Sequence, residues 1–369
     1  MSRYKLRKAT DQDHEAINQL YYRITGRKRS AAQYAWEWLE NPAGESERWV
    51  ICEESTGDVV AHHGLIPIRF NAWGTALLAG KTENTMVAPE HRNKFVYLSF
   101  EKKMFEEAKQ RFDVFFTTAG RGAPGMIRKR LGYERTGWWT TYVLYASPRY
   151  ILSRLAVTAR LRRMGPFLLP VLSLGVAAYR ALRIRMGQPK SASRMVKTLR
   201  FDEHKEEVED FWRKNKSHFG LTPERSGAYL EWRFGRNPYN PYQLCLGYKE
   251  GQLNGYAVTR PGKVRTRDGV LRRMVIEDLV VAGNDRRLYE RFLKELLSDP
   301  SECDLGVLRT VESEDALNAA LRNRRFFPWR QQPTGEAGGA PFYAYAHGSA
   351  GPAKGWFVTE ALSEGVIEE

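Results

Sequence analysis

The sequence predicts an α/β protein, with mixed sheets of the α+β kind, in which one fold occurs twice. Apolar segments with the alternation typical of strands are interspersed with segments of helical periodicity. The chain has 369 residues, which favours two domains. The order of these segments in the first half returns in the second half. The 42% hydrophobic and 27% charged content is typical of a packed globular protein.

The first half, residues 1–147, is predicted to open with a strand and two helices. The strand begins at Tyr4, and the first helix follows Thr10 as its N-cap. The second helix ends at Asn41, because Pro42 cannot continue it. We then expect strands over 48–53, 59–68 and 75–87, a helix over 95–111, a strand over 114–118, a helix over 124–131 and a strand over 138–144.

The second half, residues 195–369, repeats this order. Trp36, Asn41 and Pro42 recur as the same residue types at the same spacing, at Trp232, Asn237 and Pro238. A strand, a turn with glycine and a second strand follow each run. The predicted strands cover 196–201, 242–248, 255–260, 272–281 and 305–308, and the helices 223–234, 285–297 and 314–322. The alternative is two unrelated lobes that share only an Asn-Pro helix stop.

A basic, partly apolar linker, residues 148–194, is predicted between the halves. Residues 135–201 contain 13 Lys/Arg and no Asp or Glu, so this one stretch holds most of the net charge of +15. Because the rest of the chain is nearly neutral, we expect no specific nucleic-acid surface. Residues 166–179 lack charge but are too short to span a bilayer. They predict a packed helical hairpin or an anchor on anionic lipid, and residues 149–200 are also suited to contact an acidic acyl carrier protein.

The cysteines predict neither disulfides nor a metal centre. Cys52, Cys245 and Cys303 lie far apart and form no CxxC pair. The N-terminal residues lack the apolar run of a signal peptide. We therefore expect a cytoplasmic protein that uses no metal, with peripheral membrane contact as an alternative.

The segment that carries chemistry is a strand, a turn and a helix around Val87–Tyr97. The strand ends at Val87, Pro89 forces a turn, and a long amphipathic helix follows. Free backbone N–H groups and the positive end of a helix are then directed at one point, which suits a pyrophosphate. Arg92 and Lys94 add positive charge beside it.

This segment resembles the GNAT acyltransferase superfamily, whose hallmark is a strand, Val-x-Pro-Glu-x-Arg and a glycine-containing turn that holds the pyrophosphate of acetyl-CoA. The positions that match are Val87, Pro89, Glu90, Arg92 and Lys94, and later Leu131, Gly132, Tyr133 and Gly137. The resemblance covers residues 4–145 and implies a cofactor site at Met86, Val87, Arg92, Asn93, Lys94, Phe95, Val96 and Tyr97. Phe95 and Tyr97 stand where the superfamily has glycine or alanine, and Arg128 stands where many members have a tyrosine proton donor.

The resemblance also implies catalytic residues. An amine attacks the thioester, so a base must first remove the ammonium proton. Glu83 lies four residues before Val87, where a carboxylate base is often found, and alternation predicts that the two share a face of the strand. His63 is a second candidate base, and Tyr133 a candidate proton donor. A backbone N–H near Met86 and Val87 is expected to stabilise the oxyanion.

The expected function is transfer of an acetyl or other acyl group from acyl-CoA to a primary amine of a small molecule, such as an amino sugar or amino acid. Three alternatives stay open: an acyl group from a longer acyl-CoA or an acyl carrier protein, an aminoacyl transfer from tRNA, and a GNAT-fold scaffold without activity that binds a partner or membrane. The matching strand of the second half carries Glu277 and Asp278 without the Pro-Glu-x-Arg turn. We expect it to support the first half or to line the substrate site.

Overall fold

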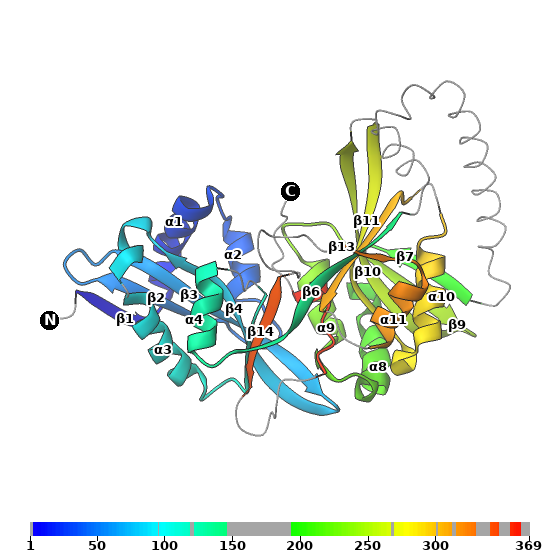
Figure 1. The fold of residues 1–369 in the computed structure, drawn as a ribbon, viewed down its shortest axis with the longest axis horizontal. Coiled ribbons are helices and arrows are strands. Elements are labelled where there is room, and N and C mark those ends of the chain that lie inside the picture. Colours follow the sequence, from blue (N-terminus) through cyan, green and yellow to red (C-terminus); the bar gives the residue numbers. More distant parts are fainter. Residues whose placement is uncertain are drawn as a thin grey trace.

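A computed structural model describes residues 3–94, 96–118, 122–145, 193–266, 269–299, 302–311, 315–329, 340–346 and 355–362 (Figure 1). The predicted linker lies outside the described residues except for its last two positions, and so does the uncharged stretch within it. Within the part that is described, no helix is both long and apolar enough to cross a membrane.

The first half has the elements that the sequence predicts, in the predicted order. They are β1 Tyr4–Lys8, α1 His14–Thr25, α2 Ala31–Trp38, β2 Glu47–Glu53, β3 Val59–Ala72, β4 Thr75–Val87, α3 Val96–Ala108, β5 Val114–Thr117, α4 Gly122–Arg130 and β6 Glu134–Tyr145. Local chemistry sets several ends. Gly26 ends α1 in the left-handed region, with φ 72°, and the Ser30 hydroxyl caps α2 by accepting from the Gln33 N–H.

The second half again alternates strands and helices. Its elements are β7 Ser193–Thr198, α8 Lys205–Asn215, β8 Leu221–Pro223, α9 Gly227–Leu230 with a π-helical turn at Glu231–Gly235, β9 Gln243–Lys249, β10 Gln252–Thr266, β11 Gly269–Val281, α10 Arg286–Leu296, β12 Leu305–Val311, α11 Ala316–Asn323, β13 Phe327–Trp329 and β14 Pro341–Ala346. The fold class is therefore mixed α/β, as predicted.

All but two of these strands lie along one path of a mixed sheet that passes through both halves. Its order is β1-β2-β3-β4-β5-β14-β6-β12-β11-β10-β9-β7, and β13 and β8 pair at the side. Strand β6 joins the halves, because residues 134–138 pair with β14 whereas residues 139–145 pair with β12. Strand β14, from near the C-terminus, lies between β5 and β6 of the first half (Figure 1).

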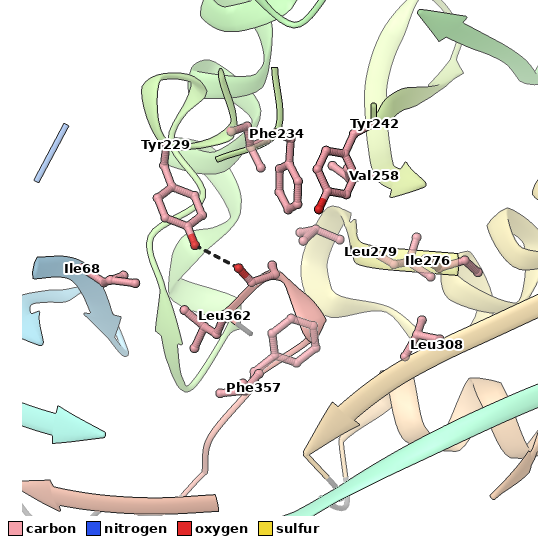
Figure 2. Packing of buried hydrophobic residues seen from close by; sticks show 14 of the residues in the cluster. Ile68, Tyr229, Phe234, Tyr242, Val258, Ile276, Leu279, Leu308, Phe357 and Leu362 are labelled. Atoms are coloured by element: carbon pink, nitrogen blue, oxygen red, sulfur yellow. Dashed lines mark hydrogen bonds between the residues drawn. The ribbon is translucent and has the colours of Figure 1, made fainter. Parts of the chain in front are cut away.

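Helices cover both faces of the first-half sheet. On one face, Ile17 of α1 and Trp38 of α2 belong to a large hydrophobic cluster with Ile68 of β3. On the other face, Phe105 of α3 packs with Leu65 and neighbouring aromatic residues. The large cluster continues into the second half, where Figure 2 shows Tyr229 and Leu362 among its members. The core is thus continuous between the halves.

The two halves also meet at the matched tryptophans. The Trp36 indole donates to the Trp232 carbonyl at 2.6 Å, and the Trp232 indole donates to the Trp36 carbonyl at 2.9 Å. Their rings stack with centroids 5.3 Å apart. Each residue makes the same contact in return, as in an interface with two-fold symmetry.

Candidate active site

Strand β4 extends beyond its pairing with β5. Among the described residues, the two pair in parallel where residues 79–81 meet residues 114–116, and β4 continues to Val87. The Ala88 N–H donates to the Val60 carbonyl of β3 at 2.9 Å. Because backbone groups alternate along a strand, the N–H of Val87 points to the opposite edge, the one that faces β5. The Val87 N–H lies at the position where the sequence predicts a backbone donor, and its role stays a prediction.

The turn after β4 is a short 3₁₀ segment, Pro89–Lys94, which leads into α3. Exposed Arg92 folds back on the strand end, and its Nε donates to the Val87 carbonyl at 3.0 Å. The Tyr4 hydroxyl lies 2.7 Å from His91 Nδ1, which ties the turn to β1. The turn therefore leads directly from the end of β4 to the N-terminus of α3. Phe95 and the side chains of Asn93, Lys94 and Val96 fall outside the described part.

Tyr97 directs its side chain toward the sheet. Its hydroxyl lies 2.8 Å from His63 Nδ1. Burial raises the pKa of Tyr97 to about 12, and burial, with Arg128 nearby, holds the pKa of His63 well below its ordinary value. We assign a neutral tyrosine that donates to a neutral imidazole. The Tyr97 side chain thus contacts His63 of β3, although it stands where the superfamily has a small residue.

Arg128 fills the place of the tyrosine proton donor with a buried ion pair. It comes from α4 and contacts Glu101 of α3, with side chains only 2% and 3% exposed. Its Nη2 also lies 3.4 Å from the Thr85 hydroxyl of β4. The pair packs beneath α3 and links both helices to β4. A guanidinium that stays charged is a poor proton donor at neutral pH.

A bulge in β4 changes the predicted face of Glu83. Opposite β3, the register passes from His62–Met86 to Gly64–Glu83, so β4 holds one extra residue, and Asn84 has φ 47°. Glu83 then lies beside Lys81, with Oε2 2.6 Å from Nζ, whereas Val87 packs, like Tyr97, against a small cluster that contains Tyr4. The prediction that Glu83 and Val87 share a face is therefore wrong, because alternation fails across a bulge.

His62 stabilises the bulge from β3. Its Nδ1 lies 2.9 Å from the Asn84 carbonyl, which accepts the hydrogen bond. Burial lowers the pKa of His62 to about 4, so the ring is neutral above that pH. His62 faces Trp38 of α2, whereas His63 faces Tyr97 of α3. The two predicted bases, Glu83 and His63, consequently lie on opposite faces of the sheet.

Glu83 belongs to a buried polar cluster that sequence reasoning missed in large part. We call it the interlobe cluster: Arg29, Glu37, Glu83 and Asn84 from the first half and Tyr239 from the second. Arg29 Nε lies 3.3 Å from Glu37 Oε2, and Asn84 donates to the other Glu37 oxygen and accepts from Arg29 Nη2 at 3.2 Å. Tyr239 packs edge-on against Trp36, with ring centroids 5.8 Å apart.

Glu37 is the carboxyl group with the most altered titration in this cluster. Burial raises its pKa to about 7, against the opposing effect of Arg29 and with the help of the Glu83 charge. A carboxylate with such a pKa is suited to accept a proton near neutral pH. The only signal in the sequence was that Glu37 is a single acid between Trp36 and Trp38, in a helix whose neighbouring residues are typical of a hydrophobic core.

Tyr133 and Met86 lie among apolar groups. Tyr133 is 5% exposed and packs with Phe105 of α3 and Tyr345 of β14, at centroid distances of 5.5 and 6.1 Å. Burial raises the pKa of its hydroxyl. Met86 belongs to the large cluster on the α2 face. Among the described residues, no group of three or more His, Cys, Asp or Glu has an arrangement that could hold a metal ion.

Comparisons with known proteins support the fold. Residues 5–136 match the model of the acetyltransferase (GNAT) domain. A probable N-acyltransferase of Enterococcus faecalis has a similar structure, with TM-score 0.64, 13% identity, and coverage of 94% of this chain and 73% of that one. A GCN5-related N-acetyltransferase of Anabaena variabilis gives TM-score 0.62 and 14% identity, with coverage of 93% and 72%.

A more distant neighbour is the Saccharomyces cerevisiae N-myristoyltransferase with bound myristoyl-CoA. It gives TM-score 0.52 and 11% identity, over 94% of this chain and 83% of that one. A search of curated proteins gave no match. At these identities the solved structures establish the fold. The domain model, which the Val87–Lys94 motif supports, assigns residues 5–136 to a GNAT domain.

Proposed function

We propose that this chain is an N-acyltransferase that takes an acyl group from acetyl-CoA, or from another acyl-CoA, and transfers it to a primary amine of a small molecule. The observation that carries the proposal is the edge of β4 near Val87, which in the described part of the chain extends beyond the pairing with β5 and which ends at the N-terminus of α3. Such an edge offers backbone donors to a thioester, and the helix end offers a positive field to phosphates.

The same edge supports the chemistry of acyl transfer. A neutral amine attacks the thioester carbon, and the Val87 N–H is directed to stabilise the oxyanion that forms. The C–S bond then breaks, and the electron pair leaves with the sulfur. Counted from the ammonium form, the nitrogen loses two protons: one goes to a base before the attack and one to the departing thiolate. Glu37 and Glu83 are the carboxylates beside the bulge that are available as the base.

Binding of acyl-CoA in the absence of an acceptor tests the proposal. Thermal unfolding is followed with acetyl-CoA, with acyl-CoAs of increasing chain length, and with acylated carrier protein. A ligand present at 100 times its Kd stabilises the fold by about 2.7 kcal/mol, so a clear rise in Tm is expected from at least one donor. A longer chain that protects better than acetyl would favour the long-acyl alternative, for which the likeness to N-myristoyltransferase is the reason to test.

Two charge reversals sharpen the test. Arg92→Glu places a negative charge at the turn and is expected to abolish protection. Arg69→Glu makes the same change at an exposed position near the distal end of β3 and is expected to retain it. No protection by any donor, or equal loss in both variants, would favour the scaffold alternative.

A further inference from the structure

Besides Arg29 Nε, which faces Glu37 in an ion pair, three buried polar atoms of the interlobe cluster have no hydrogen-bond partner in the described part of the chain. They are Arg29 Nη1, Glu37 Oε2 and the Tyr239 hydroxyl. The Arg29 side chain is 1% exposed and the Glu37 side chain 10%. Arg29 Nε and Glu37 Oε2 lie close enough for an ion pair, but neither atom makes a hydrogen bond within the described part of the chain. Buried polar atoms nearly always have partners, so three together call for a ligand or ordered water.

The chemistry of these atoms defines what fits. Glu37 Oε2 accepts a hydrogen bond from a cation, Arg29 Nη1 donates to an anion, and the Tyr239 hydroxyl can donate or accept. A simple amine would satisfy Glu37 but leave the guanidinium N–H without a partner, at a cost in binding. A molecule that carries an ammonium group next to a carboxylate satisfies both. Arg recognises carboxylates well, because its planar N–H groups match their geometry.

Two members of the cluster, Asn84 and Tyr239, are partly exposed. Arg29, Glu37 and Glu83 lie deeper. Tyr239 is held in place by the edge-on contact with Trp36, whose indole is bonded to Trp232. The second half therefore supplies one polar group of the site and fixes its position.

We propose that the interlobe cluster is the acceptor site and that the acceptor is a free amino acid, with its amine at Glu37 and its carboxylate at Arg29 and Tyr239. This inference rests on the proposed acyltransferase function and narrows its substrate class. Glu37 takes one proton from the ammonium group, which leaves a lone pair on nitrogen to form the N–C bond. The second N–H proton leaves with the thiolate as CoA-SH, and Glu37 releases its proton to solvent. The raised pKa of Glu37 is in keeping with this role.

Calorimetric titration of the full chain with the twenty standard amino acids, without acyl-CoA, tests the site. At least one amino acid is expected to bind, and its decarboxylated amine is expected to bind at least tenfold more weakly. If no amino acid binds, or if the amine binds as well as its parent, the assignment is wrong and ordered water satisfies the three atoms.

Two tyrosine variants isolate the contribution of the second half. Tyr239→Phe removes one hydroxyl and is expected to raise the Kd and KM for the amino acid several-fold while kcat changes little. Tyr22→Phe, at a half-exposed tyrosine of α1, is the matched control and should change neither. Glu37→Gln is expected to lower kcat at least a hundredfold, with a smaller change in KM. Equal behaviour of the two tyrosine variants would overturn the role of Tyr239.

The two proposals fail in distinguishable ways. If acyl-CoA protects the fold but no amino acid binds, the acyltransferase proposal stands and this acceptor assignment falls. If an amino acid binds but no acyl donor does, the site remains an amino-acid site in a protein that does not transfer acyl groups. Mass spectrometry of mixtures that contain both ligands then shows whether an N-acyl amino acid forms.

Discussion

Strands β4 and β11 each run for 13 residues, and each contains a bulge where it pairs with the preceding strand. Their buried acids differ in surroundings. Asp278 of β11 accepts from Arg225 Nε at 2.9 Å, from the Thr359 hydroxyl at 2.7 Å and from the Tyr256 hydroxyl at 3.3 Å. Both carboxylate oxygens of Asp278 thus have partners, whereas beside β4 the Glu37 Oε2 has no hydrogen-bond partner among the described residues.

From this difference we infer that the buried acids of β11 support the fold, whereas those beside β4 are suited to bind a ligand. A buried charge whose hydrogen bonds are all formed stabilises one particular fold. If one member of a buried ion pair is removed, the other stays buried without a counter-charge, which costs free energy. A buried charge with unused hydrogen-bonding capacity is ready for a ligand. Glu277 of β11 is likewise committed, with an oxygen 2.8 Å from Arg260 Nε. These contacts favour a supporting role for Glu277 and Asp278 over the expectation that they line a substrate site.

The largest effect is expected from Asp278→Ala. The substitution leaves Arg225 buried and without its counter-charge, which should lower the free energy of unfolding by about 3–5 kcal/mol. Chemical denaturation measures it. Asp210→Ala on α8, whose ion pair with Arg213 is exposed on both sides, is the control and should cost well under 1 kcal/mol. Similar losses in the two variants would break the contrast between the strands.

The pH dependence of stability should single out Glu37. Its folded-state pKa is raised to about 7 from 4.5, so its contribution to stability is present below pH 4.5 and is lost as pH rises through 7. The difference of about 2.5 pKa units corresponds to about 3 kcal/mol. Glu37→Gln should therefore gain stability relative to the parent by up to that amount between pH 4.5 and 8.

Urea denaturation at a series of pH values measures this gain. Glu54→Gln, at an exposed position in the same half, should show a constant difference from the parent. A flat difference for Glu37→Gln as well would mean that Glu37 is ionised in the fold at all these pH values, and the contrast with Asp278 would weaken.

The smallest effect concerns the contact between the halves. Trp232→Phe keeps most of the stacking on Trp36 but removes the hydrogen bond to the Trp36 carbonyl. We expect a loss of about 1 kcal/mol in unfolding free energy. Trp36→Phe removes the reciprocal bond, and a loss of similar size in both variants would support the two-fold character of the contact. A much larger loss in one of them would contradict it.

The sequence predicted the elements well where the signals were local. Pro89 and Gly132 each mark an element end that the structure has, because proline and glycine act through the backbone of their own segment, whereas α2 ends at Trp38, before the Asn41 predicted from Pro42. The bulge at Asn84 was not predictable in this way, since an asparagine in a strand does not reveal whether the partner strand will skip it. Glu37 was missed for a similar reason: only the fold brings Arg29 and Tyr239 beside it.

The position of β14 gives the chain an unusual order of folding. The sheet of the first half lacks a strand until residues 341–346 have been synthesised, although β6 ends at Tyr145. At ordinary translation rates the ribosome needs on the order of 10–40 s to add the intervening residues. During that interval β5 and the N-terminal part of β6 lack their common partner, and unpaired strand edges invite wrong pairing. The sheet of the first half is therefore expected to be completed only after most of the second half has been synthesised.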